Sequence, residues 1–518
     1  MLFNSYLFVF IFLPVSLLGY YLSMRKIGNK AAKLWLIVMS LWFYGSFRLE
    51  YLLILLVSVG LNYAVCIGVQ HAGGKASGNG KPLLILGVAG NLALLGYFKY
   101  TNFFIENLNA VSGMRLSSLQ LLLPIGISFF TFQQISFLVD VYRGEIRECG
   151  WIDYVLYITY FPKLVEGPLV KHEELLPQFE EIGRKQMDGE RFVKGVVLFV
   201  LGMLKKVILA DTFGGAVNYG YSNLEIMHGS DALLLVLFYS LQLYFDFSGY
   251  CDMARGISWM FGIELPVNFN SPYKARNIID FWKRWHITLN RFFTKYVYIP
   301  LGGNREGKVK MYRNLLLIFL LSGIWHGAGW NFILWGMMHG VLYVITRMWQ
   351  ERNRQKSAAN ISGRAQTDGQ LKRETSGNGT RILSSITHGM GVIVTFLYVN
   401  VAWVYFRAES VAQGNALLRK IFENDFPRIN RNLAGYFNLD EFWYILKVLR
   451  LDQWEYGHYL LMFVITAVAL LLVFWGKNAA QVAERIKPKL WNALLFAGLF
   501  LWCVLTFSNV STFLYFNF

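Results

Sequence analysis

The sequence predicts an all-α protein, a polytopic bundle of transmembrane helices with short or re-entrant helices around a central tunnel. The 518-residue chain is 55% hydrophobic and 17% aromatic, and its mean hydropathy is +0.39. Its apolar residues form long uncharged blocks, such as residues 34–47, 51–69 and 83–98, and several blocks approach the roughly 20 residues that cross a bilayer. A soluble core has no place for so many uniformly apolar helices, whereas in lipid each helix satisfies its own backbone groups.

Basic residues lie in short clusters between these apolar blocks, although the formal net charge is +17. Such clusters are typical of cytoplasmic loops, so the first cluster, at residues 25–33, indicates an extracytoplasmic N-terminus. The clustering argues against a nucleic-acid partner and for the lipid bilayer. The apolar start has no basic residues before it and no small-residue cleavage site after it, so we interpret it as a membrane helix rather than a removed signal peptide.

We expect one membrane domain over residues 1–518, with about ten to twelve crossings. Residues 119–346 are predicted to form the catalytic core with its tunnel, because charged residues interrupt its apolar spans and charges at membrane depth usually face a protein interior or a cavity. Residues 347–381 are rich in Ser, Gly, Asn and Arg and predict a flexible cytoplasmic loop. Residues 382–518 are expected to form C-terminal helices.

His326 is the strongest candidate for chemistry. Apolar or small residues precede it, and an apolar helix follows it. Gly327 and Gly329 are expected to break the helix and allow close backbone approach, which at membrane depth is tolerated only beside protein or a cavity. A neutral imidazole is the usual general base for a hydroxyl or thiol. A histidine that only hydrogen-bonds between helices has comparable weight on residue type alone, and the glycine break favours the catalytic interpretation.

His286 ends the run Trp282-Lys-Arg-Trp-His286. Trp282, Trp285 and Leu289 are expected to share one helical face. Two interpretations stay open. One is an interfacial amphipathic helix with aromatic anchors. The other is a helix that carries His286 into a cavity whose basic residues meet an anionic donor.

Other polar residues receive weaker assignments. His339 is expected to be a packed or interfacial histidine. Asp246 and Asp252 are expected to flank a Ser-Gly turn, and to form ion pairs in preference to orienting a histidine. The four cysteines are widely scattered and show neither metal spacing nor a disulfide framework. No Walker loop, dinucleotide fingerprint, zinc motif or Gly-x-Ser-x-Gly elbow is present, so we expect no metal, no permanently bound cofactor and no serine nucleophile.

Several stretches in a shared order resemble the membrane-bound O-acyltransferase family, most closely its alginate O-acetyltransferase branch. The resemblance covers nearly the whole chain. The matching stretches are the Phe3-Asn-Ser-Tyr opening, Tyr160-Phe-Pro-Lys-Leu-Val-Glu-Gly-Pro168, Asp246-Phe-Ser-Gly-Tyr250, Phe281-Trp-Lys-Arg-Trp-His286, Trp325-His-Gly-Ala-Gly-Trp-Asn-Phe332 and the aromatic C-terminus.

The resemblance implies a funnel-shaped bundle in a bacterial inner or plasma membrane, with His326 at the family's signature position and His286 at its second polar position. It implies that an acyl group, expected to be acetyl from acetyl-CoA as co-substrate, enters from the cytoplasm and passes toward an extracytoplasmic polysaccharide. It also implies a separate SGNH-type partner that completes the transfer. The expected tunnel-lining supports are Trp325, Asn331, Arg284, Trp285, Asp246 and Ser248.

Three alternatives remain at the level of sequence. The cargo could be D-alanine for teichoic acid or acetyl for peptidoglycan, although the D-alanyl branch is typically shorter. A polysaccharide transporter would explain the charges at membrane depth, but it predicts internal repeats, which the sequence lacks. A catalytically inactive scaffold would tolerate loss of His326.

Overall fold

Helices form every regular element in the described part of the chain, which confirms the predicted all-α fold. The computed structural model describes residues 1–518 except 149, 183–186, 368–377, 424–425, 439–440, 442, 451–453, 455, 488, 510–512 and 515–518. Six described helices are long and apolar enough to cross a membrane. They are Phe8–Lys26, Leu49–His71, Lys81–Ser112, Gly229–Met260, Thr387–Arg407 and Gly457–Phe474. The expected total of ten to twelve crossings stays a prediction.

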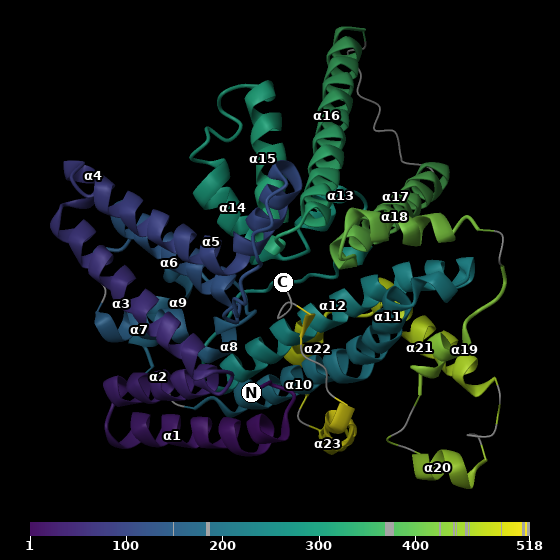
Figure 1. Cartoon of the computed structure of the whole chain (residues 1–518), viewed down its shortest axis with the longest axis horizontal. Helices are drawn as coiled ribbons and strands as arrows, with labels where there is room; N and C mark the ends of the chain where they lie inside the picture. Colours follow the sequence, from purple (N-terminus) through teal and green to yellow (C-terminus); the bar gives the residue numbers. More distant parts are fainter. Residues whose placement is uncertain are drawn as a thin grey trace.

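The N-terminal third is a layer of helices that pack one on the next (Figure 1). Its longer helices are α1 (Leu13–Lys26), α2 (Asn29–Gly45), α3 (Leu49–His71), α5 (Lys81–Ser112), α6 (Ile127–Tyr142) and α7 (Trp151–Thr159). Its shorter helices are η1 (Phe8–Phe12), α4 (Gly74–Ser77), α8 (Phe161–Leu164) and α9 (His172–Glu180). A membrane span was expected at residues 119–139, but the helix there, α6, begins only at Ile127. Gly126, just before it, has a φ of 73°, which a helix does not adopt.

At the centre of the molecule, the contiguous helical segments of residues 189–222 pack closely against the long helix of residues 229–260. The elements of this central region are α10 (Gly189–Met203), the π-helix η2 (Leu204–Ala210), α11 (Asp211–Ser222), η3 (Leu224–Ile226) and α12 (Gly229–Met260). Helix α12 is buried along most of its length. Its N-terminal half belongs to one of the two large apolar clusters and its C-terminal end to the other. It therefore joins the two halves of the molecule.

The predicted Ser-Gly turn between Asp246 and Asp252 is wrong, because both residues lie inside α12. Gly249 does not form a turn; it lets the backbones of α12 and α10 approach closely. A Cβ added to Gly249 would lie 2.8 Å from the Gly202 carbonyl oxygen of α10, and one added to Gly256 would lie 2.6 Å from that of Gly195. Small residues let helix backbones approach in membrane bundles. The ion pairs predicted for the aspartates do form, since Asp246 contacts Lys206 at 2.7 Å and Asp252 contacts Lys205 at 2.5 Å.

The histidine-bearing segment follows α12. It contains η4 (Pro272–Lys274), α13 (Ile278–Trp282), α14 (Ile287–Phe293), the π-helix η5 (Thr294–Tyr298), α15 (Lys308–His326) and α16 (Trp330–Thr367). Helices α15 and α16 form an antiparallel hairpin around Gly323 and Gly336. A Cβ on Gly323 would lie 2.4 Å from the Phe332 carbonyl oxygen, and one on Gly336 would lie 2.4 Å from that of Phe319.

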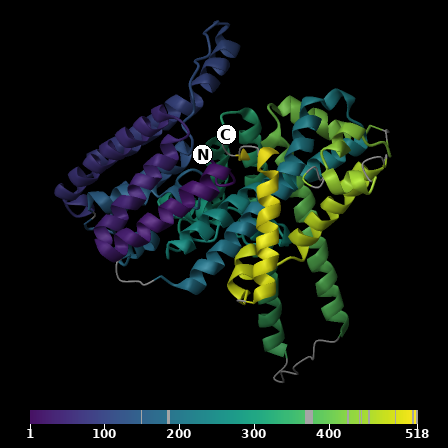
Figure 2. The ribbon, with the colours of Figure 1, turned by 90° about the horizontal axis from the view of Figure 1, so that it is seen from below.

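The C-terminal part adds further helices around this core. They are α17 (Asn378–Arg407), α18 (Val411–Lys420), α19 (Arg431–Gly435), α20 (Trp443–Val448), α21 (Gly457–Phe474), α22 (Ala479–Arg485), α23 (Leu490–Leu505) and η8 (Thr506–Asn509). The segment 347–381, expected to be a loop, is helical at both ends, and residues 368–377 lie outside the described residues. Figure 2 shows the adjoining ends of α16 and α17 projecting beyond the rest of the molecule.

Candidate active site

His326 is the last residue of α15, as the glycines that follow it predict. Gly327 is the C-cap, with an extended backbone. A Cβ on Gly327 would lie 2.1 Å from the Phe332 ring, so only glycine fits this approach. The His326 side chain is buried, with the Trp335 and Phe406 rings 5.1 Å from its own ring, centre to centre.

Helix α5 satisfies the carbonyl groups at this end of α15. The last four carbonyls of a helix lack partners inside the helix. Here Gly327 N donates to the carbonyl of Gly323, and the Tyr100 hydroxyl donates to that of Ile324 at 2.6 Å. The Lys99 ammonium donates to the carbonyls of Trp325 at 2.6 Å and His326 at 3.0 Å. The helix end that carries His326 is therefore held by its neighbour.

His286 lies in a turn rather than on a continuous helix, so the predicted helical face through Trp282, Trp285 and Leu289 is wrong. Its φ of 46° and ψ of 51° are left-handed and separate α13 from α14. The Asn290 side chain holds this turn by donating to the carbonyls of Trp282 and Trp285. The turn aims the His286 ring into the protein, where it is fully buried.

Asn268 determines which nitrogen of His286 carries the proton. Its Oδ1 accepts hydrogen bonds from the Thr288 backbone N at 3.2 Å and hydroxyl at 2.9 Å, and lies 3.2 Å from His286 Nδ1. Because this oxygen is an acceptor, Nδ1 must be the donor. Nε2 therefore keeps its lone pair, and it has no hydrogen-bond partner among the described residues. A free imidazole nitrogen of this kind can accept a proton or a hydrogen bond from a substrate.

The two histidines lie together in the core. Their ring centres are 6.3 Å apart, and the Trp325 ring is 4.8 Å from His326 and 6.1 Å from His286. Phe129 packs against Trp325, with ring centres 5.3 Å apart. Of the two histidines, only His326 borders a hollow, so it is the one that a substrate in that hollow would contact.

Two hollows lie at opposite ends of α15. The first is a small cavity of about 30 Å³, bordered by His326, Trp325, Lys99, Ser128 and Glu166 among others. The second, of about 740 Å³, is bordered by the first half of α15 together with α14, η5 and five basic residues. These are Lys171, Lys283, Arg291, Lys295 and Arg347. No lining residue is shared between the two.

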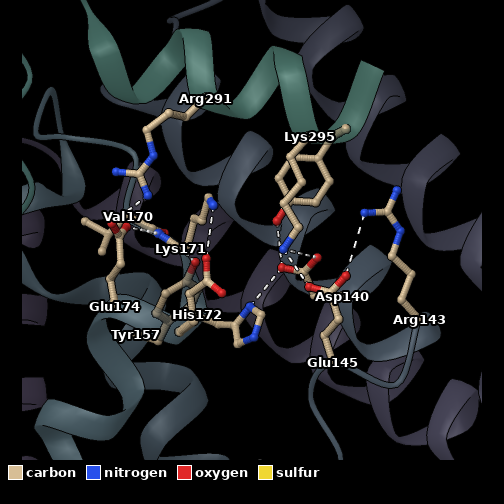
Figure 3. A network of polar contacts seen from close by, with 12 residues as sticks. Asp140, Arg143, Glu145, Tyr157, Val170, Lys171, His172, Glu174, Arg291 and Lys295 are labelled. Carbon is tan, nitrogen blue, oxygen red and sulfur yellow. Dashed lines mark hydrogen bonds and ion pairs between the residues drawn. The ribbon is translucent and has the colours of Figure 1, made fainter. Parts of the chain in front are cut away.

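An ion-pair network forms one wall of the second hollow (Figure 3). Lys295 contacts Asp140 at 3.1 Å and Glu145 at 2.6 Å, and Arg291 contacts Glu174 at 2.5 Å. Asp140 also accepts hydrogen bonds from the Tyr296 hydroxyl at 2.6 Å and from His172 Nδ1 at 2.8 Å. The network ties α14 and η5 to α6 and α9.

The same carboxylates could in principle hold a metal ion. Ligand atoms of Asp140, Glu145 and His172 lie within 4.8 Å of one another. The Lys295 ammonium already contacts both carboxylates, so a metal ion would have to displace it. The arrangement therefore fits an ion-pair network better than a metal centre.

Of the predicted site residues, the structure brings together only His326, His286 and Trp325. Trp285 is buried beside Phe269 and Trp403. Asn331 donates to the carbonyls of Tyr405 and Ala408 and anchors the start of α16. The other three pair elsewhere: Arg284 with Asp280 at 2.9 Å, Asp246 with Lys206, and Ser248 with Lys205 at 3.4 Å.

Two contributors were missed by the sequence reasoning. Lys99 stands just after an apolar block, and its charge at membrane depth was the only available signal. Asn268 lies in the stretch Asn268-Phe-Asn-Ser-Pro-Tyr273, whose polar residues gave no indication of which one contacts a histidine. His339 packs between Trp282 and Trp335, as predicted for a packed histidine, and accepts from Trp282 Nε1 at 3.3 Å.

The fold and the site together define a multi-pass membrane protein with a buried histidine pair, of which His326 borders a hollow. A family model described as "MBOAT, membrane-bound O-acyltransferase family" matches residues 141–366. The chain is 38% identical to the peptidoglycan O-acetyltransferase of Helicobacter pylori over 445 residues, which are 81% of this chain and 79% of that protein. It is 37% identical to the Pseudomonas aeruginosa protein named "Probable alginate O-acetylase AlgI", over 84% of this chain and 78% of that protein.

A more distant relative is the teichoic acid D-alanyltransferase of Bacillus subtilis, 31% identical over 44% of this chain and 60% of that protein. The chain belongs to the membrane-bound O-acyltransferase family, as the sequence motifs indicated. It is an O-acyltransferase and a multi-pass membrane protein.

Proposed function

We propose that the protein takes an acetyl group from acetyl-CoA on the cytoplasmic side of a bacterial cell membrane and passes it outward for O-acetylation of an extracytoplasmic polysaccharide. The observation that carries the proposal is the buried pair of His326 and His286, with His326 bordering one hollow while a basic hollow lies at the other end of the same helix. The N-terminus is placed outside in this proposal, following the basic cluster after the first helix.

In the proposed step, His326 removes the proton from an acceptor hydroxyl. The hydroxyl oxygen then attacks the thioester carbonyl carbon, the carbon–sulfur bond breaks, and the proton passes to the departing thiolate. The products are an acetyl ester and free coenzyme A. His286, through the lone pair on Nε2, orients the acceptor hydroxyl.

The basic hollow supports an anionic donor. Four of its five basic side chains already contact carboxylates: Lys171 contacts Glu173, Arg291 contacts Glu174, Lys295 contacts Asp140 and Glu145, and Arg347 contacts Glu351. Lys283 is exposed and has no carboxylate within ion-pair distance among the described residues. Its ammonium is therefore available to a phosphate group of the donor.

The final acceptor is proposed to be an alginate-like or other cell-surface glycan, reached with an SGNH-type partner outside the membrane. Peptidoglycan is the second candidate acceptor, because the Helicobacter pylori relative carries that name and matches most of both chains. D-Alanyl transfer has weaker support, since the relative named for it matches less than half of this chain.

The test is acetyl-ester content in a deletion strain complemented with the wild type, His326→Ala or His286→Ala at matched protein levels. Acetyl esters are measured separately on exported polysaccharide and on purified peptidoglycan. We expect His326→Ala to abolish acetylation of one of them, which also identifies the acceptor class, and His286→Ala to reduce it at least about tenfold. Full acetylation with His326→Ala would contradict the proposal and favour a transporter or scaffold.

A further inference from the structure

Lys99 brings a charged group to the turn that carries His326. Its ammonium donates to the carbonyls of Trp325 and His326 and lies 3.4 Å from the Ser128 hydroxyl. No carboxylate lies within ion-pair distance of Lys99 among the described residues. An ammonium inside a membrane bundle without a counter-charge is costly, and such residues usually mark a functional site. All its hydrogen bonds go to the histidine's own turn and to one serine.

The structure around Lys99 fixes where the ammonium lies. Ser128 is in the first turn of α6, and Gly126 just before it has a left-handed backbone. A Cβ on Gly126 would lie 2.9 Å from the Leu164 carbonyl oxygen, so this loop is seated directly on its neighbour. The ammonium is thus held between a fixed loop and the end of α15, and it borders the same hollow as His326.

We propose that Lys99 is a positioning residue for His326. By binding the carbonyls of Trp325 and His326 it sets the rotation of the last turn of α15, and with it the direction of the imidazole toward the acceptor hydroxyl. It also orients Trp325, whose ring lies against both histidines. This inference rests on the proposed role of His326 as the base. Removing the ammonium leaves two helix carbonyls without their donor and lets the turn relax.

Tyr100 provides a matched control. It stands next to Lys99 on α5, and its hydroxyl donates to the Ile324 carbonyl at 2.6 Å, so it also joins α5 to the end of α15. It does not bind the carbonyl of His326 or of Trp325. If Lys99 served only to hold the two helices together, loss of the Tyr100 hydroxyl would have the same effect on turnover as loss of the Lys99 ammonium.

The experiment measures coenzyme A release from acetyl-CoA by membrane vesicles of the complemented deletion strain, with unacetylated polysaccharide from that strain as acceptor. The full-length variants are Lys99→Met, Lys99→Arg, Tyr100→Phe and His326→Ala, each normalised to protein level. For Lys99→Met we expect kcat to fall about 100-fold, the effect of a displacement near 1 Å. Its KM for acetyl-CoA should stay within about twofold of the wild type, because the ammonium does not border the donor hollow. Lys99→Arg, which keeps donors and charge, should recover a measurable part of kcat, and Tyr100→Phe should stay within about threefold of the wild type.

Lys99→Met turnover above half of the wild-type value, or equal losses in Lys99→Met and Tyr100→Phe, would overturn the inference. If Lys99→Met fails to accumulate, Lys99→Gln takes its place with the same criteria. Activity in His326→Ala, or none in the wild type, would overturn the proposed function instead, so the two failures are distinguishable.

Discussion

At the scale of single residues, both candidate histidines are held by polar side chains from distant parts of the chain. Asn268 holds His286 in one tautomer, and Lys99 holds the turn of His326. In the proposed mechanism each histidine supplies the reactive nitrogen, and a polar group from a distant part of the chain sets where that nitrogen points. Supporting groups of this kind are often as important as the reactive residue itself.

Asn268→Leu should lower turnover about 10- to 100-fold, because His286 loses the acceptor that keeps its proton on Nδ1. Asn268→Asp keeps an oxygen acceptor and should recover part of the activity. The exposed neighbour Asn270 makes no side-chain hydrogen bond to any of the residues that the structure describes, and Asn270→Ala should behave like the wild type. Coenzyme A release by vesicles measures all three. Equal activity of Asn268→Leu and Asn268→Asp would refute the tautomer argument.

Local sequence was enough to predict where the helix that carries His326 ends, because the glycines that end it are its immediate neighbours. His286 lies beside His326, but the helix predicted to carry it is a turn, since its left-handed backbone depends on Asn268 and Asn290 rather than on local periodicity. Lys99 could not be predicted as a contact of His326 at all. The two residues are 227 positions apart in the chain, and no pattern in a single sequence reports such a pairing.

At the scale of elements, glycines decide which helices touch. Apolar periodicity predicted that helices exist, but not that α10 and α12 would meet at two pairs of glycines, nor α15 and α16 at another. The same reasoning took the Ser-Gly dipeptide of α12 for a turn. In a membrane bundle a glycine is as much a packing residue as a helix breaker, and the choice between these roles is made by the neighbouring helix.

Gly249→Ala should destabilise the folded protein by about 1–3 kcal/mol, because its Cβ meets rigid backbone of α10 rather than a mobile side chain. Gly90→Ala in α5 is the control, since nothing lies within 4 Å of its added Cβ. The control should be neutral or slightly stabilising. Thermal unfolding of detergent-purified full-length variants gives the comparison. Equal melting midpoints would show that α10 and α12 do not need this contact.

At the scale of the whole molecule, the two hollows differ in charge and in size, which suits two different substrates. The larger one gathers five basic side chains, four of which are already balanced by carboxylates. The fifth, Lys283, is exposed, and under the proposed function it is the one left to recognise the donor. The net charge of the chain did not predict this cluster of basic residues, because its excess of basic residues is mostly spread over loops.

Lys283→Ala should raise the KM for acetyl-CoA roughly tenfold, the equivalent of about 1.4 kcal/mol, while kcat stays near the wild-type value. The effect should shrink at high salt, because an exposed charge is screened. Lys310→Ala removes another exposed lysine, one that pairs with Glu306 and borders neither hollow, and should leave the KM unchanged. The KM for acetyl-CoA of each variant is measured in membrane vesicles at two salt concentrations. An unchanged KM for Lys283→Ala would remove this lysine from donor recognition.

Helix α12 has a consequence for how cargo crosses the membrane. Because one continuous buried helix belongs to both apolar clusters, neither half can rotate against the other without unpacking it. Rocking-bundle transport, in which two halves open alternately to each side, would require the packing around α12 to come apart. Under the proposed function α12 stays in place, and only the acyl group changes sides.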